Sequence, residues 1–197
     1  MLRSPASPPR RRPVLAAASA AAFAAVLSIA PAAATDYVQA AGSTLAFATQ
    51  YDGETFTGTF PAFTTKLSFD PAHLAASKLD VVIPLAGANT GNDDRDTTLR
   101  SADFFDVAKF AQAHYAATRF RSLGGDRYAA DGTLELHGVR KPVTLTFTWT
   151  PGAAPVLAGK ATVKRLDFGV GGGDWADTSV LPDAVAISTR VVLAPAP

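Results

Sequence analysis

Residues 143–149 read VTLTFTW, the clearest alternation of apolar and polar residues in the chain. Val143, Leu145, Phe147 and Trp149 occupy the odd positions, and threonines occupy the positions between them. Successive side chains of a β-strand point to opposite faces, so this pattern predicts an antiparallel strand with one buried and one exposed face.

The same alternation recurs on both sides of this stretch. Strands are expected at about residues 45–49, 56–60, 63–69, 79–85, 114–121, 128–136, 157–163 and 185–193. Asp52-Gly53 and Gly124-Gly125 are turn signals between neighbouring strands. A closed barrel or a two-sheet sandwich would satisfy so many one-sided strands, and their sequential hairpin spacing favours a barrel. The predicted fold class is therefore all-β, an antiparallel β-barrel of about eight strands.

One long segment lacks strand alternation, residues 95–110, RDTTLRSADFFDVAKF. Asn92 is placed to cap a helix that begins at Asp93. Phe104, Phe105 and Phe110 must then be buried against something. The segment is expected to form a short helical flap between strands. It either closes one end of the barrel as a structural element or gates a cavity with aromatic rings that touch a ligand.

The N-terminus has the pattern of a removable export signal. Arg3 and residues 10–12 are basic, residues 14–29 are apolar, and residues 32–34 are alanines. We therefore expect residues 1–34 to be a signal peptide and residues 35–197 to be one domain. The apolar run is short for a membrane span, which makes an N-terminal anchor the less favoured alternative. Arg11-Arg12 loosely matches a twin-arginine signal, so the export route is left open.

Composition excludes several functions. The leader holds four of the 18 basic residues and no acidic ones, so residues 35–197 carry 14 basic against 17 acidic residues. This balance gives no reason to expect a nucleic-acid partner. The chain has no cysteine, which excludes thiolate chemistry. Three histidines lie without metal-ligand spacing, and no G-x-S-x-G motif occurs. No metal, no cofactor and no enzyme activity are expected.

Several ordered motifs resemble the YceI-like family over nearly the whole of residues 35–197. They are Gly58-x-Phe60, Phe69-Asp70-Pro71, Thr90-Gly91, Arg95-Asp96-x-x-Leu99-Arg100-Ser101-x-Asp103-Phe104-Phe105-Asp106-Val107, Gly132-x-Leu134-x-Leu136-His137-Gly138-Val139-x-Lys141-Pro142-Val143 and Lys164-Arg165-x-Asp167-Phe168-Gly169-Val170. Each motif is weak alone, and their order and spacing carry the resemblance. One departure is Ala111 after Lys109-Phe110, where the family usually has proline.

The resemblance implies a lipocalin-like barrel that encloses an elongated apolar pocket for a polyisoprenoid chain, such as a polyprenyl phosphate or a quinone tail. It also implies a periplasmic or secreted protein, and some family members are linked to stress responses or to membrane cytochromes. A membrane cytochrome or a lipid-handling protein is the partner that this suggests. The sequence leaves a homodimer open.

Candidate ligand contacts are the aromatic and branched residues of the inner faces and the flap. They are Phe47, Phe60, Phe63, Phe69, Val81, Ile83, Phe104, Phe105, Phe110, Phe120, Phe147, Trp149 and Phe168. Arg95 and Asp96 of the flap and His137 and Lys141 of a turn are the candidates for a lipid head group. The alternative for the first pair is structural ion pairing, and for the second a solvated hairpin tip.

The function expected from the sequence is binding of an isoprenoid lipid for transport or storage, without catalysis. Two alternatives differ in what lies inside the barrel. A packed scaffold for a membrane redox or stress system would have a filled interior and an exposed apolar patch. An enzyme that acts on a bound lipid would need Arg95, Asp96 or His137 to point into the pocket.

Overall fold

The computed structural model describes Met1 and residues 34–197. The predicted export signal lies in residues 2–33, outside the described residues. Residues 35–197 fall within one compact unit.

Ten strands make up a single antiparallel sheet. They are β1 (Thr35–Gln39), β2 (Thr44–Tyr51), β3 (Glu54–Thr59), β4 (Thr64–Phe69), β5 (Lys78–Pro84), β6 (Gln112–Gly124), β7 (Arg127–Leu136), β8 (Val139–Thr150), β9 (Val156–Lys164) and β10 (Ala184–Pro195). The predicted strands correspond to β2 to β10. Strand β1 was missed, because TDYVQ is short and its alternation is weak.

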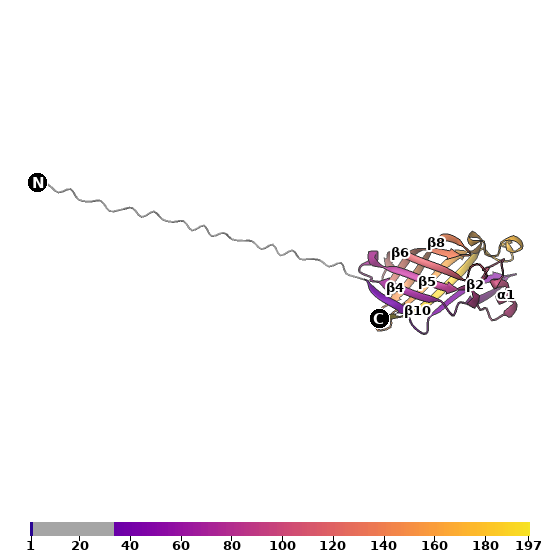
Figure 1. Cartoon of the computed structure of the whole chain (residues 1–197), viewed down its shortest axis with the longest axis horizontal. Coiled ribbons are helices and arrows are strands. Elements are labelled where there is room, and N and C mark those ends of the chain that lie inside the picture. Colours follow the sequence, from indigo (N-terminus) through magenta and orange to yellow (C-terminus); the bar gives the residue numbers. More distant parts are fainter. Residues whose placement is uncertain (2–33) are drawn as a thin grey trace. The chain divides into compact units, whose positions relative to one another are not determined.

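The sheet closes on itself and forms a barrel. Strands β4 to β10 pair in sequence order, and β1 pairs with both β4 and β10, so eight of the ten strands complete the ring. Tyr37 lies opposite Leu67 on one side and Pro195 on the other. The predicted all-β antiparallel barrel is confirmed, and Figure 1 shows β4, β5 and β6 side by side in its wall.

The β2–β3 hairpin extends the wall at one end of the barrel. Strand β2 pairs with β10 from Ala186 to Arg190, while β1 takes the last residues of the same edge. Asp52 and Gly53 turn the hairpin with φ of 49° and 79°, as the sequence signal predicts. The free edge of β3 is tied by a single bridge between Thr59 and Asn89.

The flap consists of one short helix and a run of turns. Helix α1 (Asp93–Arg100) begins where expected, and the Asn92 Oδ1 accepts a hydrogen bond of 2.9 Å from the Arg95 N–H. It lies at one end of the barrel (Figure 1). The helix ends at Arg100, so Phe104 and Phe105 lie on turns, where both are buried.

Candidate functional site

The barrel encloses an apolar cavity of about 190 Å³. Its wall has 30 residues from the strands, the flap and the segment between β9 and β10, and nearly all of them are aliphatic or aromatic. The polar members of the wall are Thr49, Thr65, Tyr115, Arg165 and Thr189. Such a surface has little to offer a polar substrate, whereas it removes the surface of a hydrocarbon from water.

The residues that line the cavity extend along the barrel wall. Every second residue of β10 from Val185 to Val191 lines it, and at about 3.3 Å per residue this stretch is about 20 Å long. For comparison, an engineered cavity of about 150 Å³ in another protein holds a single benzene. The lining residues of the present cavity follow the strands over this length, which is the direction along which an extended chain would lie.

Two small residues, Gly159 and Ala161, lie on the inward side of β9. On β9, Leu157, Gly159 and Ala161 follow one another on the side that faces inward. A Cβ on Gly159 would lie 2.9 Å from the Leu145 side chain, so this leucine already occupies the room that the glycine leaves. Ala161 lines the cavity.

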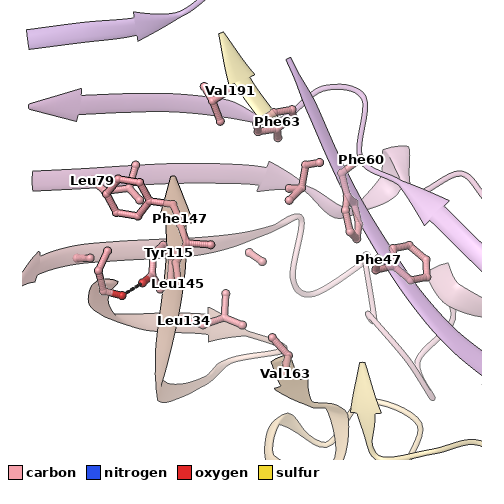
Figure 2. Close-up of a cluster of buried hydrophobic side chains, with 14 of the residues drawn as sticks. Phe47, Phe60, Phe63, Leu79, Tyr115, Leu134, Leu145, Phe147, Val163 and Val191 are labelled. Carbon is pink, nitrogen blue, oxygen red and sulfur yellow. Dashed lines mark hydrogen bonds between the residues drawn. The ribbon is translucent and has the colours of Figure 1, made fainter. Parts of the chain in front are cut away.

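Seven of the predicted ligand contacts line the cavity. These are Phe47, Phe60, Phe63, Val81, Ile83, Phe104 and Phe105. Figure 2 shows Phe47, Phe60 and Phe63 among the buried side chains, together with Leu134 and Leu145 from the other side of the barrel. The two flap phenylalanines thus contribute to the wall, and a gating role of the flap stays a prediction.

Four other predicted contacts fill the barrel and do not line the cavity, which corrects the expectation for Phe69, Phe120, Phe147 and Trp149. The Phe69 ring lies 4.9 Å from Trp149, 5.6 Å from Phe147 and 5.1 Å from Tyr128 between ring centroids. Phe120 joins the same cluster at 5.9 Å from Phe69. The alternation of the strands points all of these side chains into the barrel. Together with Tyr128 they form a cluster of five packed rings, which fills this part of the interior.

Phe110 and Phe168 also lie away from the cavity, contrary to the expectation. Phe110 packs against the β7–β8 turn, with its ring centroid 5.0 Å from that of His137. Phe168 is 1% exposed and sits at the end of the short helix η3 (Arg165–Phe168). Its carbonyl oxygen lies 3.1 Å from the His137 Nδ1. These contacts link the end of the flap at Phe110, the β7–β8 turn at His137 and η3.

None of the predicted head-group residues lines the cavity. The Arg95 guanidinium lies 4.4 Å from the Phe56 ring centroid, behind the wall that this phenylalanine forms. The buried Asp96 carboxylate accepts hydrogen bonds from the Thr90 N–H and hydroxyl at 2.8 and 2.6 Å. Lys141 is exposed on β8. The structural interpretation of the flap pair is the one that the geometry favours.

Arg165 is the charged residue of the wall that sequence reasoning missed. It is 4% exposed, and its five N–H groups donate to the carbonyl oxygens of Val170, Gly171, Trp175, Leu181 and Pro182. Burial lowers the pKa of its guanidinium. The side chain thus ties η3 to residues 170–175, which follow it, and to residues 181–182 before β10. Only its place in the quoted motif Lys164-Arg165 singled it out.

Tyr115 gives the wall a phenol that is turned toward backbone groups. Its hydroxyl donates to the Ala130 carbonyl at 2.8 Å, with the Val143 carbonyl at 3.1 Å (Figure 2). Burial raises the pKa of Tyr115 to about 12. A phenol that stays protonated and bonded to the backbone is a structural group and offers no general base.

Within residues 34–197, no cluster of three or more histidine, cysteine, aspartate or glutamate side chains is arranged to hold a metal ion. In this described part of the chain, no helix has the length and apolar character needed to cross a bilayer.

The model of the YceI-like domain family matches residues 37–193. A UPF0312 protein of Vibrio campbellii is 34% identical over 116 residues, which are 57% of this chain and 61% of that protein. A UPF0312 protein of Pseudomonas savastanoi is 34% identical over 122 residues, or 58% and 64% of the two chains. The chain thus spans less than two thirds of the length of these relatives.

Solved structures share the barrel. BcnA of Burkholderia cenocepacia superposes with a TM-score of 0.73 at 28% identity, covering 76% of this chain and 95% of that one. A YceI protein of Campylobacter jejuni gives 0.61 at 26% identity, with 71% and 84% covered. A polyisoprenoid-binding domain from Saccharophagus degradans gives 0.64 at 18% identity, with 83% and 99% covered, a similarity that shows the fold alone.

Proposed function

Because the chain belongs to the YceI-like family, we propose that its barrel binds a polyisoprenoid or another long apolar lipid tail. The observation that supports this proposal is the apolar cavity inside the barrel. The Saccharophagus neighbour, described as a polyisoprenoid-binding domain, adds support from a shared fold.

The energetics of such a cavity suit a hydrocarbon ligand. Burying one methylene group is worth about 0.8 kcal/mol, so one isoprene unit contributes roughly 2–4 kcal/mol before ordering costs. A few units reach the roughly −8 kcal/mol of micromolar binding without any charge inside the barrel. An extended chain can therefore be held by the wall alone.

The polar groups near the cavity support binding without catalysis. Arg95, Asp96 and His137 do not line it, and the Arg165 donors are all engaged by carbonyl oxygens. Carriage or storage of a lipid outside the cytoplasm is the role that follows, given the basic and apolar pattern of residues 1–34. The filled scaffold is disfavoured, because the interior is hollow.

A substitution that fills the cavity tests the proposal. Ala161 lines the cavity, whereas Ala158 on the same strand is exposed, so Ala161→Phe and Ala158→Phe form a matched pair. We expect Ala161→Phe to weaken binding of geranylgeraniol at least about tenfold, because the new ring takes the space of the chain. Ala158→Phe should bind like the wild type. Co-elution in gel filtration followed by solvent extraction measures both.

Circular dichroism of the two variants checks that each one folds. Equal binding by Ala161→Phe and Ala158→Phe would show that the lipid does not enter this cavity, and the proposal would fall.

A further inference from the structure

Strands β8 and β9 pair over only part of their length. Their last pair toward the β7–β8 turn is Thr146 with Lys160, and both strands continue beyond it. In the described sheet, this part of β8 pairs only with β7, and this part of β9 pairs only with β10. The chain closes again at the hydrogen bond between His137 and the Phe168 carbonyl. We call the unpaired stretch, residues 139–145 of β8 and 161–164 of β9, the seam.

Pro142 prevents the β8–β9 ladder from continuing across the seam. The Trp149 N–H donates to the Asp126 carbonyl on the β7 side, so the odd-numbered residues of β8 direct their backbone groups toward β7. The even-numbered residues, which include Pro142 and Thr144, therefore direct theirs toward β9. Proline has no N–H to donate, and within sheets it occurs at edges and bulges. The sequence itself thus keeps this part of the two strands unpaired.

The cavity reaches the seam from the inside. Val143 and Leu145 line it from β8, and Ala161 and Val163 line it from β9. Figure 2 shows Leu145 and Val163 among the buried side chains. Val143 and Ala161, by contrast, are only partly buried. The apolar surface of the cavity therefore continues to both margins of the unpaired stretch.

The exposure of Lys141 shows that solvent reaches the wall at the seam. The strand register puts Lys141 opposite Leu134, and alternation puts it on the same face as Val143. Both of these neighbours line the cavity, whereas Lys141 is exposed. A lysine that belongs to the inner face of a barrel can reach water only where the wall is open. The break in the ladder beside Lys141 is that opening.

Three lysines border the seam. Lys160 and Lys164 are exposed on β9, and Lys141 is exposed on β8. Among the described residues, none of the three forms an ion pair. One exposed carboxylate, Asp167, lies on η3 next to them. Residues 35–197 carry fewer basic than acidic residues, so this excess of free positive charge is a local feature.

We infer that the seam and its three lysines form a docking surface for an anionic membrane, and that the lipid passes between bilayer and cavity through the seam. This inference rests on the proposed lipid binding and adds the surface at which the ligand is exchanged. Lysines close to an anionic bilayer are attracted to it, and the attraction decays within a Debye length. An apolar opening between such lysines lets a hydrocarbon chain leave the bilayer without crossing water.

The charge of the flap end argues against docking by that end. Its exposed carboxylates belong to the flap and to the loop that packs against it through Phe104 and Trp175. They are those of Asp93, Asp94, Asp103, Asp174 and Asp177. An approach by this end would bring these negative charges against an anionic surface, which is unfavourable. The seam therefore offers the complementary charge beside a route to the cavity.

Transfer of retinol, a fluorescent isoprenoid, from vesicles to the protein tests the inference. The vesicles are phosphatidylcholine with or without phosphatidylglycerol, and they carry a quencher, so that transfer restores the fluorescence of retinol. The wild-type protein should take up retinol about tenfold faster from the anionic vesicles. High salt should remove this advantage, because it screens the attraction.

The triple variant Lys141→Gln/Lys160→Gln/Lys164→Gln should transfer retinol at the same rate from both kinds of vesicle. The ratio of the two rates is the readout, since it does not depend on the affinity of the cavity for retinol. Lys66→Gln/Lys78→Gln/Arg119→Gln is the matched control. It removes the same charge from exposed positions of β4, β5 and β6 and should keep the wild-type ratio.

A cross-link across the seam tests the route. The chain has no cysteine, so a bismaleimide will join only the cysteines of Thr144→Cys/Thr162→Cys, at exposed positions on the two margins. This cross-link should slow transfer from both kinds of vesicle at least about tenfold, because it obstructs the opening. Thr148→Cys/Ala158→Cys joins the same two strands where they already pair and should transfer like the wild type.

An unchanged preference for anionic vesicles in the triple lysine variant overturns the inference while lipid binding stands. Wild-type transfer through the cross-linked seam overturns it as well. If the lysine variant keeps the wild-type ratio but binds free farnesyl phosphate less tightly, the lysines bind a phosphate of the ligand and do not dock a membrane. If retinol does not bind at all, the inference and the proposed function fail together.

Discussion

At the scale of single residues, Arg165 holds one end of the barrel together through backbone carbonyls alone. Lysine has three donors on one nitrogen and cannot reach five carbonyl oxygens in a planar arrangement. Arg165→Lys should therefore leave buried carbonyls unpaired and destabilise the protein by about 2–4 kcal/mol. Urea unfolding measures the change. Arg127→Lys, at an exposed position of β7, should stay within about 0.5 kcal/mol of the wild type.

Tyr115 should make stability depend on pH in the alkaline range. Its pKa is raised to about 12 in the folded protein, whereas an unfolded tyrosine has a pKa of about 10. Below pH 10 both states are protonated and the contribution is fully present. Between about pH 10 and pH 12 the unfolded state releases the proton first, so stability falls as pH rises, by up to about 3 kcal/mol.

Urea unfolding of Tyr115→Phe across this range is the measurement. The variant should lose the part of the alkaline decline that Tyr115 causes. The exposed Tyr51→Phe is the control and should decline like the wild type. A Tyr115→Phe protein with the unchanged wild-type slope would contradict this account of the buried phenol.

At the scale of elements, the flap depends on the start of α1. Asn92→Ala removes the side chain that accepts from the Arg95 N–H, and it should lower stability by about 1 kcal/mol. In a domain of this size that corresponds to a fall of about 2–4 °C in melting temperature. Thr97→Ala, at an exposed position within the helix, should be neutral or slightly stabilising. Equal losses in both variants would argue against the cap.

Local patterns predicted most elements and left the contacts between them open. Alternation located β2 to β10, and the asparagine cap located the start of α1, because both signals are complete within a few residues. Arg165 could not be recognised, since its partners Trp175 and Leu181 come from a loop whose path no periodicity describes.

At the scale of the whole molecule, the free volume inside the barrel could not be predicted from the sequence. Phe63 comes just before β4 and Phe69 ends it, and both are buried, yet the first lines the cavity and the second packs into the aromatic cluster. An eight-stranded barrel is either just filled by side chains or holds one small ligand. Whether a given section of the barrel is filled or hollow depends on the summed volumes of the side chains that all strands contribute to that section.

Native mass spectrometry of the protein purified from cells that produce the full chain, followed by solvent extraction, tests lipid binding most directly. The account predicts an added mass that extraction identifies as a lipid with an isoprenoid chain or another long apolar chain. It also predicts that the same preparation of Ala161→Phe carries less of this lipid than Ala158→Phe. A bare wild-type protein that also takes up no added geranylgeraniol would contradict the account and return the barrel to the role of a scaffold.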